Sequence, residues 1–100
     1  MKGRNLIMNL NFFGQKRLDY LKEHRPIQYN EMATQGTLQE HIMSIQEEAE
    51  QKWQLLMEQN QKEWKLTEQL KTENPEEWIG LMTNLKEEMR VQVLQELIYN

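Results

Sequence analysis

The sequence predicts an all-α protein: a long antiparallel helical hairpin, with arms at about 38–72 and 75–98, preceded by two short helices. Apolar residues recur at steps of three and four over most of the chain, which keeps them on one face of a helix. Both prolines stand where a helix would begin, and no dipeptide marks a β-hairpin. At this length we expect a single helical domain over residues 1–100.

The N-terminal third is expected to hold a tail and the two short helices. Residues 1–11 show no period, so we expect a flexible tail or a short strand there. Residues 14–23 carry apolar side chains at helical spacing. Pro26 then begins a second helix, because proline suits the first turn of a helix. Gly36 ends that helix, because glycine readily takes the left-handed conformation of a C-terminal cap.

A long helix is predicted from Leu38 onward. Thr37 and Glu40 have the T-x-x-E spacing of a capping box, and no proline or glycine interrupts residues 37–74. At about 1.5 Å per residue, a continuous helix of this length would span on the order of 50 Å. A compact domain of this size has a radius of gyration of about 13 Å. The helix therefore either bends, near residues 59–66, or belongs to an elongated molecule.

The turn between the two long helices is marked by Asn74 and Pro75. Asparagine caps a helix through its side chain, and proline suits the first helical position. Trp78, Leu85 and other apolar residues then share one face as far as Ile98, and we expect Trp78 in the hairpin core. Because the turn is short, the two helices should pack as an antiparallel pair.

Charge divides the chain into a basic head and an acidic body. The net charge is −4 at pH 7. Residues 1–25 hold six Lys and Arg against two acids, whereas the remainder holds six against fourteen. Cysteine is absent, which fits a reducing compartment, and no run of about 20 apolar residues could span a membrane. We therefore expect a cytoplasmic protein that does not enter the membrane.

Side chains suited to catalysis or metal binding are scarce. There is no cysteine, Ser44 is the only serine, and no glycine-rich phosphate loop occurs. His24 and His41 fall on separate predicted helices, not at the i, i+4 spacing of a two-histidine metal site. We therefore expect no enzyme activity, no metal site and no cofactor.

Two groups of residues are candidates for binding instead. On the acidic body, carboxylates and tryptophans of the long helix would meet a partner protein: Glu47, Glu50, Trp53, Glu58 and Trp64. On the basic head, four cations would meet nucleic-acid phosphates: Lys16, Arg17, Lys22 and Arg25. Each group also has a purely structural interpretation, because tryptophan and methionine build helix cores and charged residues solvate helix faces.

One distinctive run of residues is Tyr20-Leu21-Lys22-Glu23-His24-Arg25-Pro26, and it is followed by Tyr29-Asn30, Gly36, Leu38 and His41. This pattern resembles the TnpV family of small transposon-encoded proteins from bacterial mobilizable elements. The resemblance resumes at residues 67–71, 77–80 and 96–99. It spans about residues 14–99 and leaves the first dozen residues outside. The family pattern often has a glycine near position 65, where this chain has Lys65.

The resemblance implies an accessory role on a mobile element and assigns no activity to a residue. Together with the acidic body, the resemblance favours a non-enzymatic protein that binds a protein or nucleoprotein partner. An anti-CRISPR-like inhibitor of a host defence nuclease would act in this way. One alternative is an excisionase-like DNA-binding factor controlling transposition, which the negative net charge disfavours. Another is a self-associating structural protein, such as a homodimer.

Overall fold

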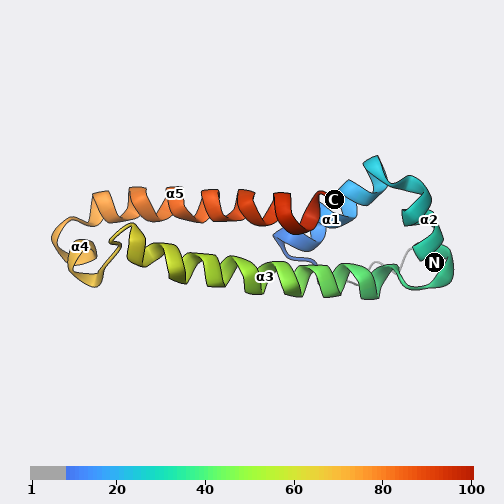
Figure 1. Cartoon of the computed structure of the whole chain (residues 1–100), viewed down its shortest axis with the longest axis horizontal. Helices are drawn as coiled ribbons and strands as arrows, with labels where there is room; N and C mark the ends of the chain where they lie inside the picture. The colour runs from blue at the N-terminus through green and yellow to red at the C-terminus, as the bar shows by residue number, and fades with distance from the viewer. Residues whose placement is uncertain (1–8) are drawn as a thin grey trace.

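The computed structural model describes residues 9–100, which form a helical rod of 55 × 25 × 18 Å (Figure 1). Helices α3 (Leu38–Glu63) and α5 (Pro75–Val93) lie antiparallel along its length. At one end α1 (Phe12–His24) packs against α3, with α2 (Pro26–Gln35) beyond it, and at the other end α4 (Glu68–Glu73) packs against α5. The predicted all-α hairpin with two short N-terminal helices is confirmed.

Residues 9–11 lie along α3 and are held there by Gln46. The Gln46 side chain accepts a hydrogen bond from the Asn11 main-chain N–H at 2.8 Å and donates one to the Asn9 carbonyl at 2.9 Å. The Asn11 side chain in turn caps α1 by accepting the N–H of Gly14 at 2.9 Å. This part of the predicted tail forms no strand, and the rest of it, residues 1–8, lies outside the described residues.

Helix α2 ends in a Schellman motif, as the glycine predicts. Gly36 has a φ of 78°, and the N–H of Thr37 reaches back to the Met32 carbonyl at 2.9 Å. The motif holds the Thr37 backbone in a helical conformation, with φ −105° and ψ 0°, and its side chain does not cap α3. The capping box predicted for Thr37 and Glu40 is therefore wrong, although α3 begins where the sequence predicts.

The long helix predicted over 38–72 is interrupted between α3 and α4. Lys65 has a left-handed φ of 57°, and the N–H of Leu66 donates to the Gln61 carbonyl at 2.9 Å, which repeats the motif that ends α2. Thr67 then caps α4, because its side chain accepts a main-chain N–H at 3.1 Å. The bend that the sequence left open near residues 59–66 is therefore a break at Lys65, and the arm expected over 38–72 consists of two helices.

Burial of Leu66 explains why the chain breaks at this point. A lysine in the left-handed region destabilises the fold by about 1 kcal/mol relative to a glycine at the same position. Burying a leucine side chain stabilises the fold by about 2 kcal/mol, and Leu66 is only 9% exposed within the core. The molecule therefore combines both outcomes that the sequence left open, since the helix breaks and the rod is elongated.

The start of α5 agrees with the prediction. Asn74 Oδ1 accepts the N–H of Glu77 at 3.3 Å, and Pro75 occupies the first turn. The helix continues to Val93 and is followed by one π-helical turn, η2 (Leu94–Ile98), in which the N–H of Tyr99 donates to the Leu94 carbonyl at 2.9 Å.

Two hydrophobic clusters hold the rod together. The larger lies between α3 and α5, and its buried members are Phe13, Ala49, Leu56, Met57, Leu66, Leu85, Met89, Val93 and Ile98. The smaller cluster joins α1 to α3 through Leu18, Leu21 and Ile42. Trp78 is half-buried and packs against the larger cluster, as predicted.

Candidate functional site

Helix α3 presents a polar stripe on the side opposite the core. Because Ile42, Ala49 and Leu56 are buried at steps of seven, residues offset by half a turn from them face solvent. We call this exposed stripe the outer face; it consists of Glu40, Ser44, Glu47, Gln51, Gln54, Glu58 and Lys62. Three carboxylates and one lysine give this surface a net negative charge.

Two of the five predicted partner-binding residues lie on the outer face. Glu47 and Glu58 are exposed and stand about three turns apart, roughly 16 Å along the helix. Neither forms an ion pair or a hydrogen bond with any residue in 9–100. Their charges are therefore available to a cationic partner surface.

The other three predicted residues are placed differently. Glu50 is half-buried on the flank of α3, with one carboxylate oxygen 3.5 Å from Asn11 Nδ2. Trp53 and Trp64 turn inward and pack half-buried against the larger cluster. The Trp53 indole also donates to the Lys86 carbonyl at 3.3 Å. The two tryptophans are hairpin core residues, so the accessible part of the predicted surface is its acidic part.

A shallow pocket of about 390 Å³ lies beside the outer face at the α1 end. Glu47 and Glu50 line it, together with the polar side chains of Gln51 and Gln54 and the thioether of Met43. A lysine or arginine side chain entering this pocket would meet two carboxylates and the Met43 thioether, all on α3.

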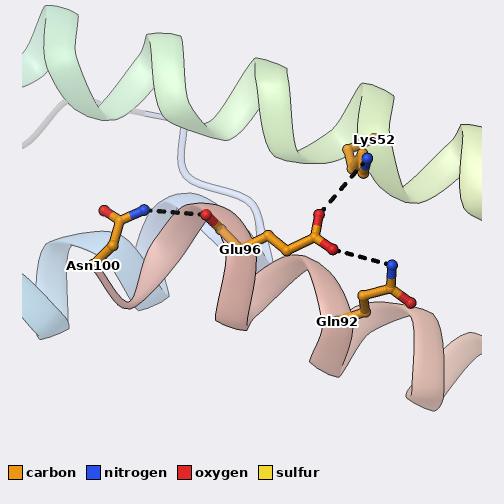
Figure 2. Close-up of polar contacts among 4 residues, drawn as sticks. All are labelled: Lys52, Gln92, Glu96 and Asn100. Carbon is orange, nitrogen blue, oxygen red and sulfur yellow. Dashed lines mark hydrogen bonds and ion pairs between the residues drawn. The ribbon is translucent and has the colours of Figure 1, made fainter.

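The one lysine in the middle of α3 does not neutralise the outer face. Lys52 Nζ lies 3.6 Å from Glu96 Oε1, across the gap between α3 and η2 (Figure 2). Gln92 donates to the other Glu96 oxygen at 3.1 Å, and Asn100 donates to the Glu96 carbonyl at 3.1 Å. This group ties the C-terminal turn to α3 and leaves the outer face acidic.

Three of the four predicted nucleic-acid-binding cations are at or near the surface of the α1 end. Lys22 and Arg25 are exposed and Lys16 is half-buried. Each lies within 6 Å of an aromatic ring: Lys16 over Phe12, Lys22 over Tyr29 and Arg25 over Tyr20. Lys16 and Lys22 are six residues apart on α1, about 120° around the helix axis, so these two cations do not share one face of the helix.

The fourth cation, Arg17, is inside the protein at 5% exposure. Its Nη1 donates to the Ile98 carbonyl at 2.7 Å and to the Asn100 carbonyl at 3.3 Å, and its Nε donates to His41 Nε2 at 3.2 Å. Arg17 therefore caps the end of the chain and does not reach solvent. The sequence gives no sign of this, because the acceptors lie far away along the chain.

His41 is neutral in this arrangement, because its Nε2 accepts the Arg17 N–H. Burial, with a further contribution from the Arg17 cation, lowers the pKa of His41 below the ordinary value of 6.5. Burial also lowers the pKa of the Arg17 guanidinium.

The fold also brings together aromatic residues that sequence reasoning did not select. Tyr20 and His24 of α1 lie beside Tyr99, with the Tyr20 ring centroid 5.1 Å from that of His24 and 5.5 Å from that of Tyr99. Tyr20 and His24 are one helical turn apart and so share a face of α1. No local pattern could have added Tyr99 to them.

A metal site or a membrane-spanning segment within residues 9–100 would need a cluster of ligand side chains or a long apolar helix. No group of three His, Asp or Glu side chains in this part of the chain is placed to hold a metal ion. None of the described helices has the length and apolar content needed to cross a membrane.

Comparison with known proteins gives a family assignment. A family model described as transposon-encoded protein TnpV matches residues 1–98 of the 100-residue chain. The match includes the first dozen residues, which the sequence resemblance left outside. No curated protein and no solved structure gives a significant match. The chain therefore belongs to the TnpV family of transposon-encoded proteins.

Proposed function

We propose that this protein is a non-catalytic accessory protein of its mobile element that binds a nucleic-acid-handling protein through the outer face of α3. It inhibits that protein by occupying the surface that otherwise holds nucleic acid. A host defence nuclease of the CRISPR type is the partner class that this action fits, because such nucleases act against incoming elements and carry basic nucleic-acid channels.

The observation that supports the proposal is the outward direction of Glu47 and Glu58, which have no ion pair with residues 9–100. Carboxylates on a rigid helix are attracted by the same Lys and Arg side chains that bind phosphate. A protein that keeps such charges exposed along a rod can compete with a nucleic-acid strand without any chemistry of its own.

The proposal can be tested by capturing the partner from the native bacterium with the tagged protein. Glu47→Lys/Glu58→Lys reverses the two outward charges and should abolish retention of a basic nucleic-acid-handling protein. A matched control, Glu31→Lys/Glu88→Lys, changes the net charge equally at exposed positions of α2 and α5 and should retain it. Equal retention by all three proteins, or retention of no such partner, would count against the proposal.

The DNA-binding alternative loses support from the placement of Arg17. One of its four cations is buried, and Lys16 and Lys22 do not share one face of α1. A gel shift with DNA from the ends of the element tests this alternative. DNA binding of this kind requires a complex that disappears when Lys16, Lys22 and Arg25 become alanine. Sedimentation of the purified chain tests the self-associating alternative, which requires a dimer or larger assembly.

A further inference from the structure

The surface of α1 that faces Tyr99 carries aromatic and charged side chains in close proximity. Tyr99 is 44% exposed, and the His24 side chain is 59% exposed. The Tyr99 ring meets the Tyr20 ring at a tilt of 40°, and the Arg25 guanidinium lies 5.9 Å from the Tyr20 centroid. The Tyr20 ring is half-buried and surrounded by these neighbours, so Tyr99 and His24 are the exposed rings that a planar ligand could reach.

Tyr20, His24 and Tyr99 line a pocket of about 340 Å³, and Arg25 lies outside it. The rest of the lining comes from α1 and consists of Lys16, Asp19 and Glu23. The spacing along α1 places these α1 residues on one side of the helix. The pocket therefore offers aromatic faces, one ammonium group and two carboxylates within the space of a single nucleotide.

The C-terminal turn holds Tyr99 in position before any ligand arrives. The residues on either side of it are both bound by Arg17, whose Nη1 donates to the carbonyls of Ile98 at 2.7 Å and Asn100 at 3.3 Å. The Tyr99 N–H is itself bonded to the Leu94 carbonyl at 2.9 Å. A ring fixed in this way loses little freedom on binding, which favours affinity.

We propose that this pocket binds single-stranded nucleic acid, with one base stacked on the exposed ring of Tyr99 and its phosphate beside Lys16. Stacking on aromatic side chains next to cations is how proteins hold unpaired strands. A base inside a duplex has its faces covered by neighbouring bases and its edge paired, so only an unpaired base can enter. The pocket lies on α1 and not on the outer face of α3, so this inference is independent of the proposed inhibition.

The two carboxylates decide which way the strand lies and which bases fit. Asp19 and Glu23 repel phosphate but accept hydrogen bonds from the exocyclic amino groups of cytosine, adenine and guanine. The base edge must therefore point toward these acids and the phosphate toward Lys16. Cytidine homopolymers should bind more tightly than thymidine homopolymers, because thymine has no exocyclic amino group.

Fluorescence anisotropy with short labelled cytidine homopolymers, in DNA and RNA forms, tests the proposal on the full chain. Wild type should bind at least one of the two strands and should bind it better than a duplex of the same length. Tyr99→Ala should weaken binding on the order of tenfold, whereas Tyr99→Phe, which keeps the ring, should bind like wild type. Lys16→Ala should also weaken binding, and Lys65→Ala, an exposed lysine at the far end of the rod, should not.

The same series contains the results that would overturn the proposal. Tyr99→Ala binding like wild type, Tyr99→Phe as weak as Tyr99→Ala, equal affinity for duplex and single strand, or no binding of either strand would each do so. Thermal melting of Tyr99→Ala checks that the fold is intact. Glu47→Lys/Glu58→Lys should keep strand binding, which separates a failure here from a failure of the proposed inhibition.

Discussion

Arg17 Nη1 donates a hydrogen bond of 2.7 Å to the main-chain carbonyl of Ile98, 81 positions later in the sequence. The last carbonyls of a helix have no partner within the helix, and Arg17 supplies one from α1. The bond joins α1, the first described helix, to the C-terminal turn η2. Two segments that are far apart in the sequence are thereby held side by side.

Replacing Arg17 should therefore destabilise the fold. Arg17→Met keeps much of the side-chain volume but leaves the Ile98 carbonyl and His41 Nε2 without their donor. We expect a loss of about 2 kcal/mol in the free energy of unfolding, measured by urea denaturation. Arg17→Lys should recover only part of it, because one ammonium group cannot reach both acceptors. A change of less than about 0.5 kcal/mol in Arg17→Met would contradict this role.

Stability should fall in mild acid because of His41. Its pKa is lowered in the folded chain, so the unfolded chain takes up the proton more readily. The contribution is complete above the ordinary pKa of 6.5 and is lost as the pH falls toward the lowered value. Urea denaturation between about pH 7 and pH 5.5 measures it. His41→Gln should flatten this dependence; an unchanged slope in His41→Gln would exclude His41 as its source.

The left-handed residue between α3 and α4 should be improved by glycine. Lys65 has φ 57° and is exposed, so Lys65→Gly removes backbone strain without losing a packed side chain. We expect a gain of about 1 kcal/mol in the free energy of unfolding. Lys65→Ala, which keeps the Cβ, serves as the control and should stay within about 0.5 kcal/mol of wild type. A less stable Lys65→Gly would mean that the turn is not strained.

Trp53 should contribute more to the stability of the fold than to partner binding. Its ring packs against the core, its indole N–H is bonded to the Lys86 carbonyl, and the Arg90 guanidinium lies 5.7 Å from its centroid. Trp53→Ala should cost about 3 kcal/mol in thermal or urea unfolding, whereas Glu47→Ala should be close to neutral. A stable Trp53→Ala that loses its partner would instead place Trp53 on the binding surface.

The features predicted correctly from the sequence are those whose signals are local. Pro26, Gly36 and Asn74 each act on the residues within one turn, so the ends of α2 and the start of α5 follow from chemistry visible in the chain. The apolar repeat likewise predicts which side of each helix is buried, because every helix must turn one face to the core.

The features that were missed depend on contacts between distant segments. Apolar spacing continues through residues 64–70, so the sequence left the break near residues 59–66 undecided, and burial of Leu66 is what makes it favourable. The same limit explains Arg17, which looks like its solvent-exposed neighbours until Ile98 is placed beside it. Among the candidate site residues, helix periodicity could separate the outward Glu47 and Glu58 from the inward Trp53, whereas the pairing of Tyr20 with Tyr99 needed the structure.

In the proposed function, the outer face of α3 competes with nucleic acid for a basic protein surface. This competition is tested most directly by adding the protein to the captured partner carrying labelled nucleic acid, and measuring displacement by anisotropy at low and high salt. Wild type and Glu31→Lys/Glu88→Lys should displace the nucleic acid, less well as salt screens the charges, and Glu47→Lys/Glu58→Lys should not. Displacement by Glu47→Lys/Glu58→Lys as effective as that by wild type would rule out competition through the outer face of α3.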